Sequence, residues 1–189
     1  MLKLYAKYFI FRVCLSQMNF IIRSEEKGDD GSILALHQSR LGPGRFAKTS
    51  YRIREQADSD IISSCVAIID GEVVGSVRQT WVYFKPSQAC LFLGPLVVDQ
   101  KSSSLGIGQA LLIAAIERAE DLGAKAVILI GDHLYYQKVG FEIAHILGHA
   151  IDFPGPVDHK RLLVKNISLK HNELLEGKMT PDNKNPSHK

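Results

Sequence analysis

The chain has 189 residues, of which 46% are hydrophobic and 23% charged, so it can build one full hydrophobic core of ordinary globular composition. Its net charge of +3 is small and its basic residues are scattered, which argues against a nucleic-acid partner. The three cysteines are far apart and form no Cys-x-x-Cys pair, so we predict neither a disulfide framework nor a zinc site, and we expect a cytoplasmic protein.

The first seventeen residues read differently from the rest of the chain. Lysines and Arg12 interrupt an aromatic and aliphatic run, which resembles a basic amphipathic segment. A membrane-touching role is one interpretation; the one we favour is an extension upstream of a natural start at Met18. We expect residues 18–170 to form a single domain, and residues 171–189, polar and containing two prolines, to form a disordered tail.

The next elements alternate between helix and strand patterns. Residues 19–24 are a short strand candidate, and residues 33–39 have helical character. A Gly-Pro-Gly loop at 42–44 precedes a second helical segment at 45–56. Two β-type runs, 61–69 and 72–84, are joined by Asp-Gly, which is a strong hairpin signal.

Residues 89–130 predict a strand, a crossover helix and a parallel strand. The first strand contains Gly94 and Pro95, which a regular ladder does not accept, so we expect a bulge there. The helix follows Gly106 and Gly108. It has apolar residues at helical spacing, namely Leu111, Leu112, Ala115, Ile116, Ala119 and Leu122. Gly123 ends the helix. At the other end, the free N–H groups of the helix N-terminus predict an anion site, most simply for a phosphate.

Three kinds of glycine loop compete for this segment. A P-loop needs lysine and then serine or threonine after its last glycine, whereas Gly108 is followed by Gln109 and Ala110. A Rossmann turn would place glycine or alanine where Leu111 stands. Glycines that only turn the chain into a helix remain an alternative for the loop taken alone.

Two further strand candidates, 141–146 and 162–167, flank a loop rich in proline and glycine. His145 and His149 have a helical metal spacing, but no carboxylate clusters with them, so we predict no metal site. These elements add up to an α/β fold with a mixed, mostly antiparallel sheet, one parallel strand pair and flanking helices.

Residues 93–141 resemble the GCN5-related N-acetyltransferases (GNAT), in a bacterial branch whose members carry three matching pieces in the same order. These pieces are here Gly94-Pro95-Leu96-Val97-Val98, Gly106-Ile107-Gly108 and Gly131-Asp132-His133-Leu134-Tyr135-Tyr136-Gln137-Lys138-Val139-Gly140-Phe141. The resemblance implies the GNAT fold, in which the parallel strand pair is splayed. A fainter likeness extends from about residue 20 to 169.

The resemblance implies acetyl-CoA as acetyl donor and no metal. The pyrophosphate would lie on the loop and helix start, here Ser103, Ser104, Leu105, Gly106, Ile107, Gly108 and Gln109. The pantetheine arm would follow Leu96, Val97 and Val98, and Lys138 would approach a CoA phosphate. The family usually has glutamine or arginine at the position of Ser103 and glycine at that of Ser104.

The resemblance also implies a catalytic tyrosine. Tyr136 occupies the tyrosine of the family pattern Tyr-x-x-x-Gly-Phe and would protonate the leaving thiolate, and a backbone N–H near Val97 or Val98 would hold the oxyanion. Arg45 and Phe46 are candidate contacts to the acceptor. The general base stays open among Asp99, Asp132, His133 and Glu142.

We therefore expect an N-acetyltransferase that moves an acetyl group to a primary amine of a small molecule or protein, by direct attack in a ternary complex. A non-catalytic acyl-CoA-binding or regulatory module is the alternative, motivated by Ser103, Ser104 and the unassigned base. A third hypothesis is a membrane-associated acyltransferase that uses residues 1–17. We expect a monomer or homodimer without a nucleic-acid or membrane partner.

Overall fold

The computed structural model of the chain describes residues 20–44 and 49–182. Its main sheet has the strand order β1-β2-β3-β4-β5-β8-β6, and β10 pairs with β3. These strands are β1 (Ile21–Ser24), β2 (Cys65–Ile69), β3 (Glu72–Tyr83), β4 (Ala89–Val98), β5 (Ala126–Ile130), β6 (Glu142–Ile143), β8 (Leu162–Asn166) and β10 (Thr180–Pro181). A second sheet pairs β7 (Ala150–Asp152) with β9 (Glu176–Lys178).

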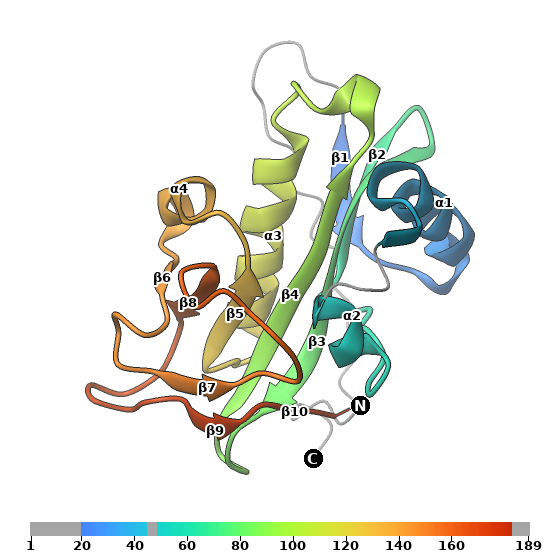
Figure 1. Cartoon of the computed structure of the whole chain (residues 1–189). Helices are drawn as coiled ribbons and strands as arrows, with labels where there is room; N and C mark the ends of the chain where they lie inside the picture. The colour runs from blue at the N-terminus through green and yellow to red at the C-terminus, as the bar shows by residue number, and fades with distance from the viewer. Residues whose placement is uncertain (1–19, 45–48, 183–189) are drawn as a thin grey trace, which may run out of the picture.

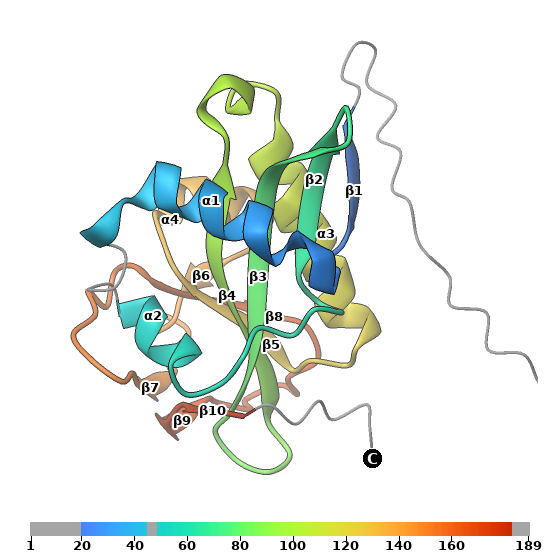
Figure 2. The same ribbon diagram turned by 90° about the vertical axis from the view of Figure 1, so that its right-hand side faces the viewer.

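Helices cover both faces of the main sheet (Figures 1 and 2). They are η1 (Lys27–Asp29), α1 (Asp30–Leu41), α2 (Thr49–Arg54), η3 (Gln100–Ser102), α3 (Ile107–Asp121), α4 (His133–Tyr136) and η4 (Gln137–Val139). Among the strands described in the main sheet, only β4 and β5 pair in parallel, and the other pairs are antiparallel. The predicted α/β fold, with a mixed, mostly antiparallel sheet and flanking helices, is confirmed.

Alternation along β3 and β4 builds two cores, one on each face. Trp81 and Leu91 point to the core beneath α3, whereas their neighbours Val82 and Phe92 point to the core beneath α2. All four side chains are almost fully buried. Strand β4 therefore contributes to both cores, which fixes its position tightly in the middle of the fold.

Two predicted turns take the expected backbone. Asp70 and Gly71 both have positive φ, +50° and +85°, as a type I′ hairpin between β2 and β3 requires. Gly123, with φ +72°, follows the last turn of α3 as predicted. The β4–α3–β5 unit is thus the crossover that the sequence indicates.

Some boundaries differ from the predictions. The second helix ends at Arg54, two residues before the predicted end, and residues 45–48 lie outside the described residues. The strand predicted at 141–146 pairs only at Glu142–Ile143, because the chain turns immediately afterwards and leaves Ile146 exposed. The loop that follows contains the short strand β7.

The disordered tail predicted from residue 171 is wrong for residues 171–182. Two apolar residues in this polar segment, Leu175 and Met179, are fully buried in the core beneath α2. Their burial docks β9 on β7 and β10 on β3. Residues 183–189 and the predicted N-terminal extension, residues 1–17, lie outside the described residues.

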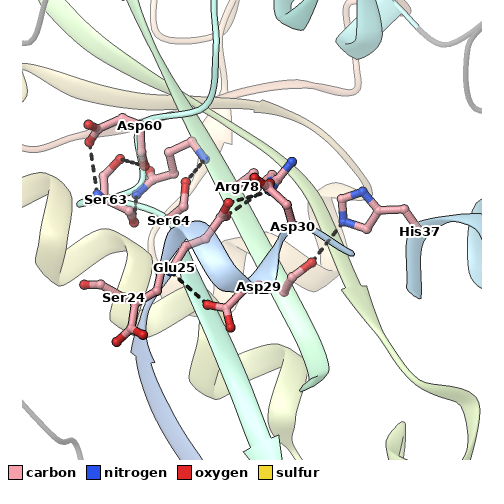
Figure 3. A network of polar contacts seen from close by, with 12 residues as sticks. Ser24, Glu25, Asp29, Asp30, His37, Asp60, Ser63, Ser64 and Arg78 are labelled. Carbon is pink, nitrogen blue, oxygen red and sulfur yellow. Dashed lines mark hydrogen bonds and ion pairs between the residues drawn. The ribbon is translucent and has the colours of Figure 1, made fainter. Parts of the chain in front are cut away.

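A polar network connects α1 and η1 to the middle of β3 (Figure 3). The guanidinium of Arg78 donates to Glu25, with Nε 2.9 Å from Oε2, and also to Asp30, with Nη2 2.6 Å from Oδ1. Nearby, His37 on α1 is hydrogen-bonded to Ser76 on β3, with Nε2 2.9 Å from Oγ. The network holds α1 on the sheet face opposite α3, beside the point where β4 bulges.

Gly75 on β3 permits the close approach of α3. A Cβ added there would lie 2.9 Å from Leu111 Cδ1 and 3.0 Å from Ile107 Cγ2, and both of these side chains are fully buried. We expect Gly75→Ala to lower the free energy of unfolding by about 1–3 kcal/mol through overpacking. Gly31→Ala on α1, where a Cβ meets open space, should instead stabilise by about 0.5–1 kcal/mol. Urea denaturation of both variants measures the difference, and equal midpoints would contradict it.

Candidate active site

Strands β4 and β5 separate halfway along their length. Their register pairs Leu91 with Val127 and Phe92 with Ile128, although β4 continues to Val98. On its other side β4 stays paired with β3, where the register shifts from Val77 opposite Leu96 to Gln79 opposite Leu93. Gly94 and Pro95 together therefore oppose the single residue Arg78. The predicted bulge is confirmed at the place where the two parallel strands part.

The separated half of β4 has backbone polar groups that do not face β3. The N–H of Asp99 donates to Val74 O at 2.8 Å, so this pair faces β3. Because hydrogen-bonding direction alternates along an antiparallel ladder, the N–H and C=O groups of Leu96 and Val98 point the opposite way. They point to the side that β5 has left, where an added extended chain could pair with them.

A cavity of about 500 Å³ opens at this separation. Its walls come from the β4 bulge, the ends of α1 and β5, α2, α4 and the loop between β7 and β8. The lining residues are Leu41, Tyr51, Phe92, Leu93, Gly94, Pro95, Leu96, Ile130, Tyr136, Pro156, Val157, Asp158 and Arg161. The volume lies in the range of small-molecule sites.

Tyr136 lines this cavity and is held by aromatic neighbours. Its ring centroid lies 4.9 Å from that of Tyr135 and 5.8 Å from that of Phe141, both edge-on. The ring also fills the place of a side chain at Gly131, where an added Cβ would overlap it. Burial raises the pKa of Tyr136 to about 12. The neighbouring Tyr135 also raises this pKa, and the positive charge of Arg161 lowers it in part. Tyr136 therefore keeps its proton at neutral pH.

The start of α3 is partly exposed to solvent, beside Val98 at the end of β4. Gly106 is its exposed N-cap with φ +75°, and its carbonyl accepts the first helical bond, from Ala110 N–H at 3.1 Å. The N–H groups of residues 107–109 therefore come before the helical ladder. A Cβ on Gly108 would lie 3.1 Å from the hydroxyl of Tyr135, so α4 closes over this first turn. The arrangement can bind an anion.

The predicted cofactor residues differ in exposure. Ser103, Ser104, Gly106, Gln109 and Lys138 are exposed, and Leu96, Val98, Leu105 and Gly108 are half-buried. The side chains of Val97 and Ile107 are buried, and by the alternation along β4 the backbone of Val97 faces β3. The Ser103 hydroxyl donates to Gln100 O at 2.9 Å, a local hydrogen bond within the loop that precedes α3.

None of the four candidate bases lines the cavity. Asp99 caps η3, and Asp132 caps α4 by accepting a hydrogen bond from Leu134 N–H at 2.9 Å. His133 and Glu142 face each other, with Nε2 3.7 Å from Oε2. Asp158 and Arg161 were not predicted; as charges in a polar loop they carry no signal that separates them from solvated residues. The candidate acceptor contacts Arg45 and Phe46 lie outside the described residues.

Residues 20–44 and 49–182 contain no group of three or more His, Cys, Asp or Glu side chains placed to hold a metal ion. In the same part of the chain, no helix is both long and apolar enough to cross a membrane. The cysteines described, Cys65 and Cys90, are buried, and burial raises the pKa of each thiol to about 12, so neither is a reactive thiolate.

Comparison with known proteins places this geometry among acetyltransferases. A sequence model described as "Acetyltransferase (GNAT) family" matches residues 32–141. The uncharacterized N-acetyltransferase YjhQ of Escherichia coli K12 is 27% identical over 146 residues, which cover 75% of this chain and 81% of YjhQ. The uncharacterized N-acetyltransferase YhbS of the same strain is 29% identical over 126 residues, covering 66% and 74% of the two chains.

Solved structures agree in fold. The crystal structure of YhbS from E. coli in complex with CoA gives a TM-score of 0.72 at 24% identity, covering 86% of this chain and 89% of that chain. A GNAT family acetyltransferase from Brucella melitensis in complex with acetyl-CoA gives a TM-score of 0.63 at 20% identity, covering 85% and 94%. Both structures share the overall fold of this chain.

Proposed function

Because the chain belongs to the GNAT acetyltransferase family and is an acyltransferase enzyme, we propose that acetyl-CoA is its donor and a primary amine its acceptor. The acetyl group moves by direct attack of the amine in a ternary complex. One observation carries the proposal: Tyr136 lines the cavity where β4 and β5 part, and its neighbour Tyr135 reaches the first turn of α3 at Gly108.

The residues at the start of α3 and along the separated half of β4 fit acetyl-CoA in kind. Backbone N–H groups at 107–109 suit a diphosphate, and glycine at 106 lets an anion approach the backbone. The outward-facing polar groups of Leu96 and Val98 suit the amides of a pantetheine arm. Ser103 and Ser104, which differ from the usual family residues, are exposed, and the backbone N–H of Ser103 donates to Gln100 O at 3.4 Å.

Bound acetyl-CoA supplies an acetyl group activated as a thioester. The chain supplies a neutral hydroxyl at Tyr136 Oη, whose pKa of about 12 lies above the reference value of about 8.5 for a thiol. Complete proton transfer from Tyr136 to a thiolate is therefore uphill, and the hydroxyl acts as a hydrogen-bond donor to developing negative charge. Outward N–H groups on the separated half of β4 are positioned donors of the same kind.

The catalytic proposal is tested with purified full-length protein. Isothermal titration with acetyl-CoA should give saturable heat, and free-thiol release should rise when a panel of small primary amines is added. Binding without thiol release on any small amine or lysine peptide would identify the non-catalytic acyl-CoA-binding module instead. Absence of binding would overturn the cofactor assignment.

A charge change at the start of α3 should affect the fold and the cofactor in opposite directions. Gln109 is exposed in the first turn, so Gln109→Glu should stabilise the helix by about 0.3–1 kcal/mol. The same carboxylate repels a diphosphate, and we expect the Kd for acetyl-CoA to rise about five-fold, roughly 1 kcal/mol.

The matched change Gln109→Lys should do the reverse on both counts, and Gln56→Glu, an exposed position at the end of α2, is the control for net charge. Thermal unfolding gives the first effect and titration at low and high salt the second. A Kd that does not respond to the sign of the charge at 109 would place the diphosphate elsewhere.

A further inference from the structure

The cavity carries one negative and one positive side chain. Among its described lining residues, Asp158 and Arg161 are the charged ones. Both are exposed at the mouth, and no ion pair joins them within the described part of the chain, although they are three residues apart. The Asp158 carboxylate has one oxygen engaged, since Oδ1 accepts a hydrogen bond from Lys160 N–H at 3.0 Å. Two opposite charges thus face one cavity without neutralising each other.

The loop that carries these charges is anchored at both ends. At its start, Phe153 packs on Phe92 in the cavity wall, with ring centroids 5.5 Å apart. At its end, the N–H of Gly131 donates to Arg161 O at 2.9 Å, and Arg161 Nε lies 3.5 Å from Gly131 O. Between them, Arg161 N–H donates to Asp158 O at 2.8 Å. The loop backbone that carries the two charges is therefore anchored before any ligand binds, which reduces the entropy lost on binding.

Arg161 lines the cavity, whereas residues 107–109 at the start of α3, which we propose for the diphosphate, do not line it. Arg161 instead shares the cavity with Tyr136, whose pKa its charge lowers. Its partner is a negative group near the reacting end of the site.

We propose that the acceptor is a small amphoteric molecule that carries a carboxylate as well as the amine to be acetylated. This inference rests on the proposed function. Asp158 attracts the ammonium form of the amine, and the planar guanidinium of Arg161 pairs with the carboxylate, which it can hold by two parallel hydrogen bonds. A protein lysine side chain or a simple alkylamine satisfies Asp158 but leaves Arg161 without a matching charge.

The test compares acceptors that differ only in the carboxylate. The pairs are alanine with alaninamide and 4-aminobutyrate with 4-aminobutyramide, which cover a short and a long spacing between the charges. With acetyl-CoA and the full chain, kcat/KM for thiol release should be at least about ten-fold higher for the acid than for the amide in one of the pairs. This is the discrimination that a good charge-assisted hydrogen-bond pair supports.

The variants assign that preference to residues. Arg161→Gln should reduce the acid-to-amide ratio to near one, and Arg161→Lys should restore part of it. Asp158→Asn should raise KM for both members of a pair alike, because both carry the ammonium. Tyr136→Phe should lower kcat for both and leave the ratio unchanged. An amide preferred in both pairs, or a ratio that survives Arg161→Gln, overturns the inference.

Failure of the proposed function would be seen separately. If acetyl-CoA binds but no amine releases thiol, catalysis is refuted, and the acceptor class is then judged by titrating the same acids and amides into the CoA-loaded protein. Tighter binding of the acid than of its amide, with the difference abolished in Arg161→Gln, supports the amphoteric ligand. Equal affinity of acid and amide, or no binding of either, rejects it.

Discussion

Replacing Tyr136 by phenylalanine is expected to lower kcat for acetyl transfer by about 10²–10³-fold, the range typical of removing one hydrogen-bond donor to developing negative charge. The ring contacts with Tyr135 and Phe141 do not need the hydroxyl, so the fold and the Kd for acetyl-CoA should change little. Steady-state kinetics and isothermal titration measure the two effects. Tyr135→Phe is the matched control and should lower kcat much less, since its hydroxyl points to Gly108 at the start of α3.

The same variant makes a prediction about pH. The pKa of folded Tyr136 is raised to about 12 from an unfolded value near 10. A raised pKa contributes stability that is fully present below about pH 10 and is lost as pH rises through 12. Wild-type stability should therefore fall more steeply than that of Tyr136→Phe in this window. An alkaline loss of kcat below pH 10 belongs to another group; a kcat equal to wild type in Tyr136→Phe would remove the tyrosine from the chemistry.

Arg78→Ala is expected to lower the free energy of unfolding by about 3–5 kcal/mol, because it leaves the Glu25 carboxylate unpaired. Glu25 is only 5% exposed, and its contacts to Arg78 compensate its burial. Denaturant unfolding at pH 7 measures the loss. Arg40→Ala, an exposed arginine on α1 with one long contact to Gln100, is the control and should stay within about 0.5 kcal/mol.

Acid should reduce the defect of Arg78→Ala. Burial already raises the pKa of Glu25 in the wild type, against the opposing effect of Arg78, and removing Arg78 raises it further. The stability contributed by protonated Glu25 is fully present below its unfolded pKa and is lost as pH rises through the folded value. The difference between variant and wild type should thus shrink towards pH 4. A difference that is constant with pH would mean that lost packing, and not the buried charge, is the cause.

Elements with local signals could be predicted from the sequence. The Asp70-Gly71 turn needs positive φ at both positions, which Asp-Gly favours. The apolar residues of α3 recur at helical spacing between two glycines. Neighbouring residues are therefore enough to predict both elements. The resemblance to the family pattern Tyr-x-x-x-Gly-Phe indicates Tyr136. Its ring lines the cavity where β4 and β5 part, and its catalytic role stays a prediction.

Elements that depend on distant partners could not be predicted. The segment from residue 171 is polar apart from a few residues, and Met179 becomes a core residue only because β3 and β7 supply the surfaces on which β10 and β9 pair. Asp158 and Arg161 are indistinguishable from solvated loop charges until the reciprocal contacts with Gly131 bring the loop to the cavity. Such information is in the tertiary structure and not in local sequence.

The two contacts between Gly131 and Arg161 mark one end of a loop segment that is suited to exchange when substrate preference is to be changed. Residues 154–160 lie between the Phe153 contact and the Arg161 contact. The residues that hold the ring of Tyr136 lie outside this segment. A transplanted segment of equal length that preserves both anchors would exchange the acceptor-facing wall as a module. Retargeting by loop grafting should therefore leave the tyrosine and the thioester-binding half of the enzyme intact.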